Sequence, residues 1–215
     1  MTQNLLTAFL LLACCAAGGC SSAYYKAWEK FGYEKRDLLV SEVEDAKSSQ
    51  EKAKEQFKTT MQRFQELTGF QGGQLEAKYK KLNGEFEACR GRAEAVTKQI
   101  SDVDETAQAM FKEWGQELEQ YQNEELKGKS RQQLNQSKER YAELIAAMRR
   151  AESKMQPVLK AFGDQVLFLK HNLNAQAIAS LQTTTSQIDS DVQALIKDME
   201  ASINEANEFI SQMKT

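Results

Sequence analysis

Apolar residues recur in this chain at alternating steps of four and three, the spacing of a left-handed coiled-coil seam between α-helices. A β-strand could not bury such a stripe, because its side chains alternate with a period of two. A single proline in 215 residues also favours helices. The stripe is clearest at Leu75, Tyr79, Leu82, Phe86, Cys89, Ala93, Val96, Ile100, Val103, Ala107, Met110 and Trp114.

An upstream segment has the same spacing and ends in glycines that can reverse the chain. Its seam consists of Val43, Ala46, Gln50, Ala53, Phe57, Thr60, Phe64 and Leu67, in which Gln50 and Thr60 would fix the register. The glycines lie at 68–73, and a second stop is predicted at 127–129, Lys-Gly-Lys, with Ser130 as the next N-cap. We therefore predict antiparallel helices over about 23–68 and 74–127, each roughly 65 to 80 Å long.

After Ser130 the stripe continues almost to the C-terminus, interrupted only by Pro157 and by His-Asn-Leu-Asn at 171–174. Pro157 predicts a bend. A helix continuous through 171–174 would be about 120 Å long, and its overhanging stripe would require a second subunit. A turn there would close four segments into one bundle. Because the apolar stripe keeps its helical phase across 171–174, the sequence slightly favours a continuous helix there. We predict an all-α, elongated antiparallel coiled-coil bundle of three long helices, the third kinked near 157 and either continuous or broken near 171–174 into a fourth.

The N-terminus has the pattern of an export signal. An apolar stretch at 5–17 is about 13 residues long, which is too short to span a bilayer comfortably. Residues 17–20, Ala-Gly-Gly-Cys, resemble a bacterial lipobox, although no Lys or Arg precedes the stretch and Ala17 stands where Leu is usual. We predict a lipoprotein signal at 1–19, a tether at 20–23 lipidated on Cys20, and one helical domain at 24–215. An ordinary cleaved signal and a crude membrane anchor are the alternatives.

Charge and cysteine content narrow the classes of function. The chain has 28 Lys and Arg against 31 Asp and Glu, interspersed, so nucleic acid is not an expected partner. Cys14 and Cys15 would leave with the signal, so only Cys89 would remain as a free thiol and no internal disulfide could form. Stability would then come from packing alone.

Three blocks of the sequence resemble a known family. They are YYKAWEKFGYEKRDLL at 24–39, FKTTMQRFQELTGFQGG at 57–73 and DQVLFLKHNLNAQAIASL at 164–181. They are similar to bacterial lipoproteins catalogued as domain of unknown function 2959. The resemblance implies an exported, lipid-anchored coiled-coil protein without an assigned activity, and it supplies no catalytic or ligand residues.

The sequence contains no constellation that predicts catalysis, a cofactor, a metal or a small-molecule substrate. His171 is the only histidine, and a helix-face or turn position explains it. Cys89 falls on the stripe and is best explained as a core residue, with a redox or disulfide role as the alternative. We therefore expect no enzyme activity.

The segment after Cys20 contains the candidate membrane-interface residues. Aromatic rings are interleaved there with ammonium groups, a mixture that suits headgroups, although packing of Trp28 and Phe31 against the other helices is the favoured explanation of those two rings. In Gram-negative cells the absence of Asp after Cys20 resembles an outer-membrane address, so we expect attachment to the periplasmic face of that membrane. The candidates are Tyr24, Tyr25, Lys26, Trp28, Lys30 and Phe31.

Two functions fit these features. The favoured hypothesis is an envelope-anchored lipoprotein acting as a structural or protein-interaction rod, which reaches a protein partner or a second copy through coiled-coil contacts. The alternative is a membrane-surface or curvature-sensing module, which would need a basic concave face. The clusters KYKK at 78–81 and MRR at 148–150 are the candidates for that face.

Overall fold

The computed structural model describes residues 35–69 and 74–214. Four long helices occupy most of these ranges: α2 (Lys35–Thr68), α3 (Leu75–Glu117), α4 (Glu124–His171) and α5 (Ala175–Met213). A short 3₁₀ helix, η1 (Leu118–Gln120), follows α3, and these ranges contain no strand. The all-α prediction is confirmed, with four long helices where continuity would have given three. At 1.5 Å per residue, α2 is about 51 Å and α4 about 72 Å long.

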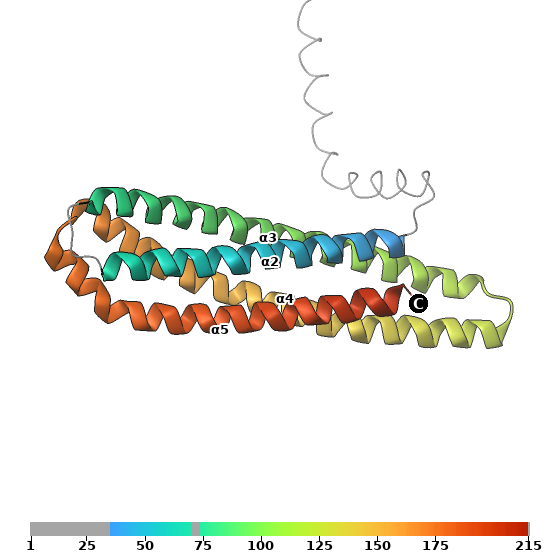
Figure 1. The fold of residues 1–215 in the computed structure, drawn as a ribbon. Coiled ribbons are helices and arrows are strands. Elements are labelled where there is room, and N and C mark those ends of the chain that lie inside the picture. The colour runs from blue at the N-terminus through green and yellow to red at the C-terminus, as the bar shows by residue number, and fades with distance from the viewer. Residues whose placement is uncertain (1–34, 70–73, 215) are drawn as a thin grey trace, which may run out of the picture.

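The helices form an elongated, antiparallel four-helix bundle (Figure 1). Each helix packs mainly against two neighbours: α2 and α4 both lie against α3 and α5. The bundle is therefore a closed ring in the order α2, α3, α4, α5, in which the first and last helices are also neighbours. Such closure leaves no apolar overhang of the kind that a continuous third helix would have created.

The core is made of the predicted stripes. Gln50, Thr60 and Cys89 are all fully buried, as the four-three spacing required. Phe64 of α2 meets Phe162 of α4 edge to face across the centre, with ring centroids 6.2 Å apart. The largest fully buried side chains are Phe57, Phe64, Phe162, Leu39, Leu67, Leu82, Leu144, Met148, Met155, Leu169, Leu181 and Leu195.

The turn between α3 and α4 lies earlier than predicted. The expected stop at 127–129 is wrong, because α4 already begins at Glu124 and runs through Gly128. Asn123 is the N-cap, and its side chain accepts hydrogen bonds from the backbone N–H groups of Glu125 and Leu126 at 2.9 and 3.1 Å. Ser130, the predicted cap, is instead buried, and its hydroxyl accepts a 2.9 Å hydrogen bond from the Trp114 indole.

The favoured continuity through 171–174 is also wrong, because α4 ends at His171 and α5 begins at Ala175. Two asparagines make this break without glycine. The Asn172 amide donates to the Phe168 carbonyl at 3.0 Å, and Asn174 accepts from the Ala177 backbone N–H at 2.9 Å as the N-cap of α5. Pro157 lies inside α4, which continues across it as predicted.

The α3–α4 hairpin extends past the described start of α2 (Figure 1). Lys35, at that start, pairs with Glu113 at 2.7 Å, and the rest of α3 and η1 continue beyond this level. The end of the hairpin carries Glu117, Glu119, Glu124 and Glu125. Lys127 and Lys129 pair with Glu119 and Glu125, so the charges at this end of the bundle are mixed.

Candidate functional site

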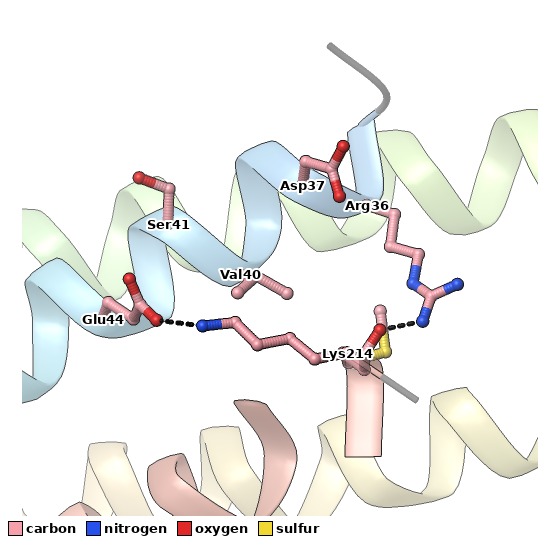
Figure 2. A pocket seen from close by; sticks show the side chains of 7 residues that line it. Arg36, Asp37, Val40, Ser41, Glu44 and Lys214 are labelled. Carbon is pink, nitrogen blue, oxygen red and sulfur yellow. Dashed lines mark hydrogen bonds and ion pairs between the residues drawn. The ribbon is translucent and has the colours of Figure 1, made fainter. Parts of the chain in front are cut away.

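A shallow depression of about 520 Å³ lies where α2 begins and α5 ends (Figure 2). Arg36, Asp37, Val40, Ser41, Glu44, Met213 and Lys214 line it. The first and last helices thus meet at the same end of the molecule, although Arg36 and Met213 are 177 positions apart in the chain.

Both cations in this depression are paired within the protein. The Arg36 guanidinium donates to the Met213 backbone carbonyl, and the Lys214 ammonium lies 2.8 Å from a Glu44 carboxylate oxygen (Figure 2). The last turn of α5 contains no basic residue of its own, so Arg36 supplies from α2 the positive charge that a helix C-terminus favours. The arrangement acts as a clasp between the chain's two terminal helices.

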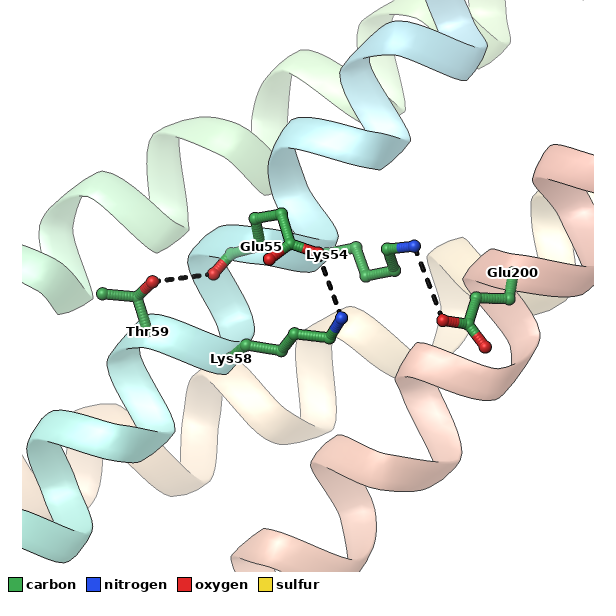
Figure 3. A network of polar contacts seen from close by, with 5 residues as sticks. All are labelled: Lys54, Glu55, Lys58, Thr59 and Glu200. Carbon is green, nitrogen blue, oxygen red and sulfur yellow. Dashed lines mark hydrogen bonds and ion pairs between the residues drawn. The ribbon is translucent and has the colours of Figure 1, made fainter.

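Further along, charged residues lie where α2 packs against α5 (Figure 3). Lys54 reaches Glu200 at 3.5 Å, and Lys58 pairs with Glu55 of the preceding turn at 3.0 Å. The Glu55 backbone carbonyl also accepts a hydrogen bond from the Thr59 hydroxyl at 2.9 Å. Such exposed pairs contribute at most about 1 kcal/mol each, so this network is a solvated surface.

A second polar cluster joins α3 to α4. Asp104 accepts hydrogen bonds from the Tyr141 hydroxyl at 2.5 Å and from the Gln108 amide at 3.0 Å, and it also pairs with Arg149. Partial burial acts to raise the pKa of Asp104, but these hydrogen bonds and the arginine outweigh it, and the pKa is lowered. Burial and the same carboxylate raise the pKa of Tyr141. The cluster holds an ionised carboxylate in place between two helices.

Cys89 is a core residue, as the stripe predicted. Its side chain is fully buried, and burial raises the pKa of the thiol to about 12, against a smaller opposite effect of the hydrogen bond with Thr60. The reactive thiolate is therefore scarce at neutral pH. This environment favours the packing role over the redox alternative.

Glu42 is a partly buried carboxyl on the α2 face toward α3. Burial raises its pKa to about 6, and Asp102 adds to that effect, while a hydrogen bond with Thr106 and the charge of Lys98 oppose it. One of its oxygens is buried without a hydrogen-bond partner among the described residues. Ionised Glu42 therefore opposes folding.

The substitution Glu42→Gln is expected to stabilise the protein at pH 7 by up to about 2 kcal/mol. The folded state keeps the Glu42 proton between the ordinary value of 4.5 and about 6, whereas the unfolded chain has released it. The Glu42 carboxyl therefore lowers the free energy of unfolding as pH rises from 4.5 to about 6. Below this range Glu42 is protonated in both states, and Glu42→Gln no longer stabilises the protein. Urea unfolding at pH 4 and pH 7 measures both effects. Glu51→Gln, at an exposed position of the same helix, is the matched control, and equal pH dependence of the two variants would contradict the prediction.

The predicted site residues have different positions. Cys20, Tyr24, Tyr25, Lys26, Trp28, Lys30 and Phe31 lie outside the described residues. His171 is exposed in the last turn of α4, in agreement with a turn position.

The two basic clusters do not form one face. Lys81 belongs to the start of α3, whereas Arg149 pairs with Asp104, which is about 35 Å further along α3. A single basic concave surface built from both clusters is therefore not present among the described residues.

Three features were not predicted from the sequence. The Arg36 clasp depends on tertiary structure and has no local signal. The Asn123 cap could have been found, because an asparagine followed by Glu124 and Glu125 is a good helix start. Leu167 and Phe168 are large apolar residues that α4 leaves exposed.

The sequence model of a family described as a protein of unknown function, DUF2959, matches residues 24–213. This chain belongs to that family. The match includes all four long helices of the DUF2959 bundle and begins before the described start of α2. No curated protein and no solved structure matches significantly. Among the helices that the structure describes, none has the length and apolarity needed to cross a bilayer.

Proposed function

We propose that this DUF2959 protein is a lipid-anchored helical rod of the cell envelope, with a structural or protein-binding role. Cys20 would carry the lipid in the periplasmic leaflet of the outer membrane. The single observation that carries the proposal is the polarity of the bundle. α2 begins and α5 ends at one end, so an anchor ahead of residue 35 would attach there and leave the opposite end facing away.

The dimensions fit such a role. The segment from Cys20 to Lys35 can span at most about 50 Å when fully extended. Beyond Lys35 the body extends by the length of α2, about 51 Å, because the α3–α4 hairpin projects past the start of α2 in the other direction. A rod of these dimensions would hold its far end well away from the lipid headgroups, where a protein partner could meet it.

The distribution of charge favours this function over the membrane-surface alternative. At the end where α2 begins, Glu119 and Glu125 pair with Lys127 and Lys129, so the charges there are mixed and do not form the basic surface that binding to anionic lipid would need. The KYKK cluster at 78–81 belongs to the opposite end, at the start of α3. A bundle tethered ahead of residue 35 would therefore hold this basic cluster at the end away from the membrane.

The substitution Cys20→Ser tests the anchor. We expect it to move most of the protein from the membrane fraction to the soluble fraction, because the acyl chains would be lost. Intact mass spectrometry of the unsubstituted protein should show a chain that begins at an acylated Cys20. Cys89→Ala removes a thiol that cannot carry the anchor, so this control should stay in the membrane fraction. A chain that keeps residues 1–19 and sediments with membranes regardless of Cys20 would overturn the proposal.

A further inference from the structure

Among the four described helices, α2 and α5 are neighbours in the ring without following each other in the chain. Turns join α2 to α3, α3 to α4 and α4 to α5, whereas α2 and α5 pack together as the first and last of these helices. We call the line along which they pack the α2–α5 seam. Each of the other three seams is tied at one end by a turn, so its helices cannot move far apart there. The α2–α5 seam is held closed by non-covalent contacts alone.

The outer edge of the α2–α5 seam consists of exposed polar side chains. The contacts that cross it along its length are Lys47–Asn207 at 3.2 Å, Lys54–Glu200 at 3.5 Å (Figure 3) and Gln65–Asp189 at 3.2 Å. All three are exposed to solvent, where such contacts compete with water and contribute little to stability. These pairs therefore set the register of α2 against α5 without holding the two helices firmly together.

A buried polar side chain of α2 weakens the same seam from inside. Gln50 lies one helical turn from Lys47 and one from Lys54, so it is on the side of α2 that faces α5. Its side chain is fully buried, and the amide has no hydrogen-bond partner among the described residues. Such an amide loses its hydration in the closed bundle and regains it when α2 and α5 separate. Gln50 therefore favours an open seam.

The opposite side of the ring, between α3 and α4, is held by partly buried contacts. Asp104 of α3 binds Tyr141 and Arg149 of α4, and the Trp114 indole donates to the Ser130 hydroxyl at 2.9 Å. Hydrogen bonds to a carboxylate are stronger than neutral ones, and partial burial shields them from water. Movement of α2 away from α5 about the α3–α4 line as a hinge would leave these contacts intact.

We propose that the α2–α5 seam opens before any other seam of the described bundle, as a book opens, with α3 and α4 as its spine. In the open form α2 stays with α3 and α5 stays with α4, because turns join these pairs. The Arg36 clasp is the latch, since the Arg36–Met213 and Lys214–Glu44 contacts both cross the seam at one end. Opening uncovers apolar stripes that the closed rod hides, so the latch controls when this surface is available. The proposal goes beyond the envelope role proposed above and does not depend on it.

Thiol labelling of the folded full chain tests which seam opens first. Four valine-to-cysteine substitutions each place a thiol at a buried position, one helical turn from a residue whose contact crosses a different seam. They are Val43→Cys beside Lys47 for α2–α5, Val103→Cys beside Thr106 for α2–α3, Val166→Cys beside Gly163 for α3–α4, and Val158→Cys beside Lys154 for α4–α5. Peptide masses give the rate at each position separately from Cys89, and the rate in the urea-unfolded chain corrects for intrinsic reactivity.

We expect the thiol at position 43 to react at least about tenfold faster than each of the other three, because those are exposed only by a larger unfolding of the bundle. Adding Gln50→Leu to Val43→Cys should slow the reaction about tenfold, since no amide then gains hydration on opening. A rate at position 103, 158 or 166 that matches the rate at position 43 would overturn the proposal, because the seams would then open together.

The latch provides a second test. Arg36→Ala should raise the labelling rate at position 43 by at least about fivefold and leave the rate at position 166 unchanged, because it releases only the α2–α5 seam. Arg90→Ala, at an exposed arginine of α3, is the matched control and should change neither rate. Equal increases at positions 43 and 166 would show a general loss of stability and would contradict the latch. Circular dichroism of each variant checks that the bundle is retained.

Discussion

Phe162→Ala is expected to destabilise the bundle by about 3 to 5 kcal/mol, the largest effect of any single substitution considered for this protein. The Phe162 ring is fully buried and packs edge to face on Phe64 at 6.2 Å. Its neighbour Gly163 lets Phe86 of α3 approach so closely that an added Cβ would lie 3.2 Å from that ring. Truncation at 162 would therefore open a cavity where three of the four helices meet.

Urea unfolding followed by circular dichroism measures this loss. Phe168→Ala is the matched control, since it is the same change in the same helix at a position that is 42% exposed. In the isolated protein we expect the control to change stability by less than about 1 kcal/mol. A similar loss for both variants would show that Phe162 does not organise the core.

Gln50→Leu is expected to stabilise the protein by about 1 to 3 kcal/mol. Gln50 is fully buried, and neither its amide nitrogen nor its amide oxygen has a hydrogen-bond partner among the described residues. Ser202 of α5 is likewise buried, and its hydroxyl has no hydrogen-bond partner among the described residues. Ser202 lies near the level of Gln50, because the Lys47–Asn207 and Lys54–Glu200 contacts join α2 to α5 on either side of Gln50. Leucine has a similar volume and leaves no polar group without a partner.

The substitution Gln50→Glu should have the opposite sign, because it places a carboxylate in the same apolar layer. Thermal unfolding of the two variants and the unsubstituted protein gives the order. Melting temperatures that rise for leucine and fall for glutamate support the account. A fall for leucine would contradict it and would show that the Gln50 amide is satisfied in solution.

The sequence allowed the core to be predicted, together with the end of α2 at Thr68 and the start of α3 at Leu75, but not the other two turns. A four-three stripe determines which face of each helix is buried, so Phe57, Phe64 and Cys89 could be placed before the fold was known. The turn predicted at 127–129 is wrong because a single glycine does not end a helix. Gly128 costs a helix about 1 kcal/mol, whereas Asn123 satisfies two backbone N–H groups and Glu124 interacts favourably with the helix dipole.

The break at residues 171–174 forms without any glycine. Asn172 and Asn174 each satisfy a backbone group at the α4–α5 turn, which is enough to end one helix and start the next. Because the apolar phase continues across this turn, periodicity alone could not distinguish a straight helix from a folded one.

The candidate sites depended on tertiary structure to different degrees. Contact between Arg36 and Met213 requires α2 to lie against α5, which no local pattern specifies.

The contact between α2 and α5 also has a consequence for biosynthesis. α2 can pair with α3 while the nascent chain is still growing, but its other neighbour is the last helix to be made. Until α5 is complete, part of the apolar stripe of α2 has no cover. A chain cut short before Ala175 would keep that stripe open permanently, so ribosome stalling or a premature stop codon late in the gene would yield a target for chaperones and proteases.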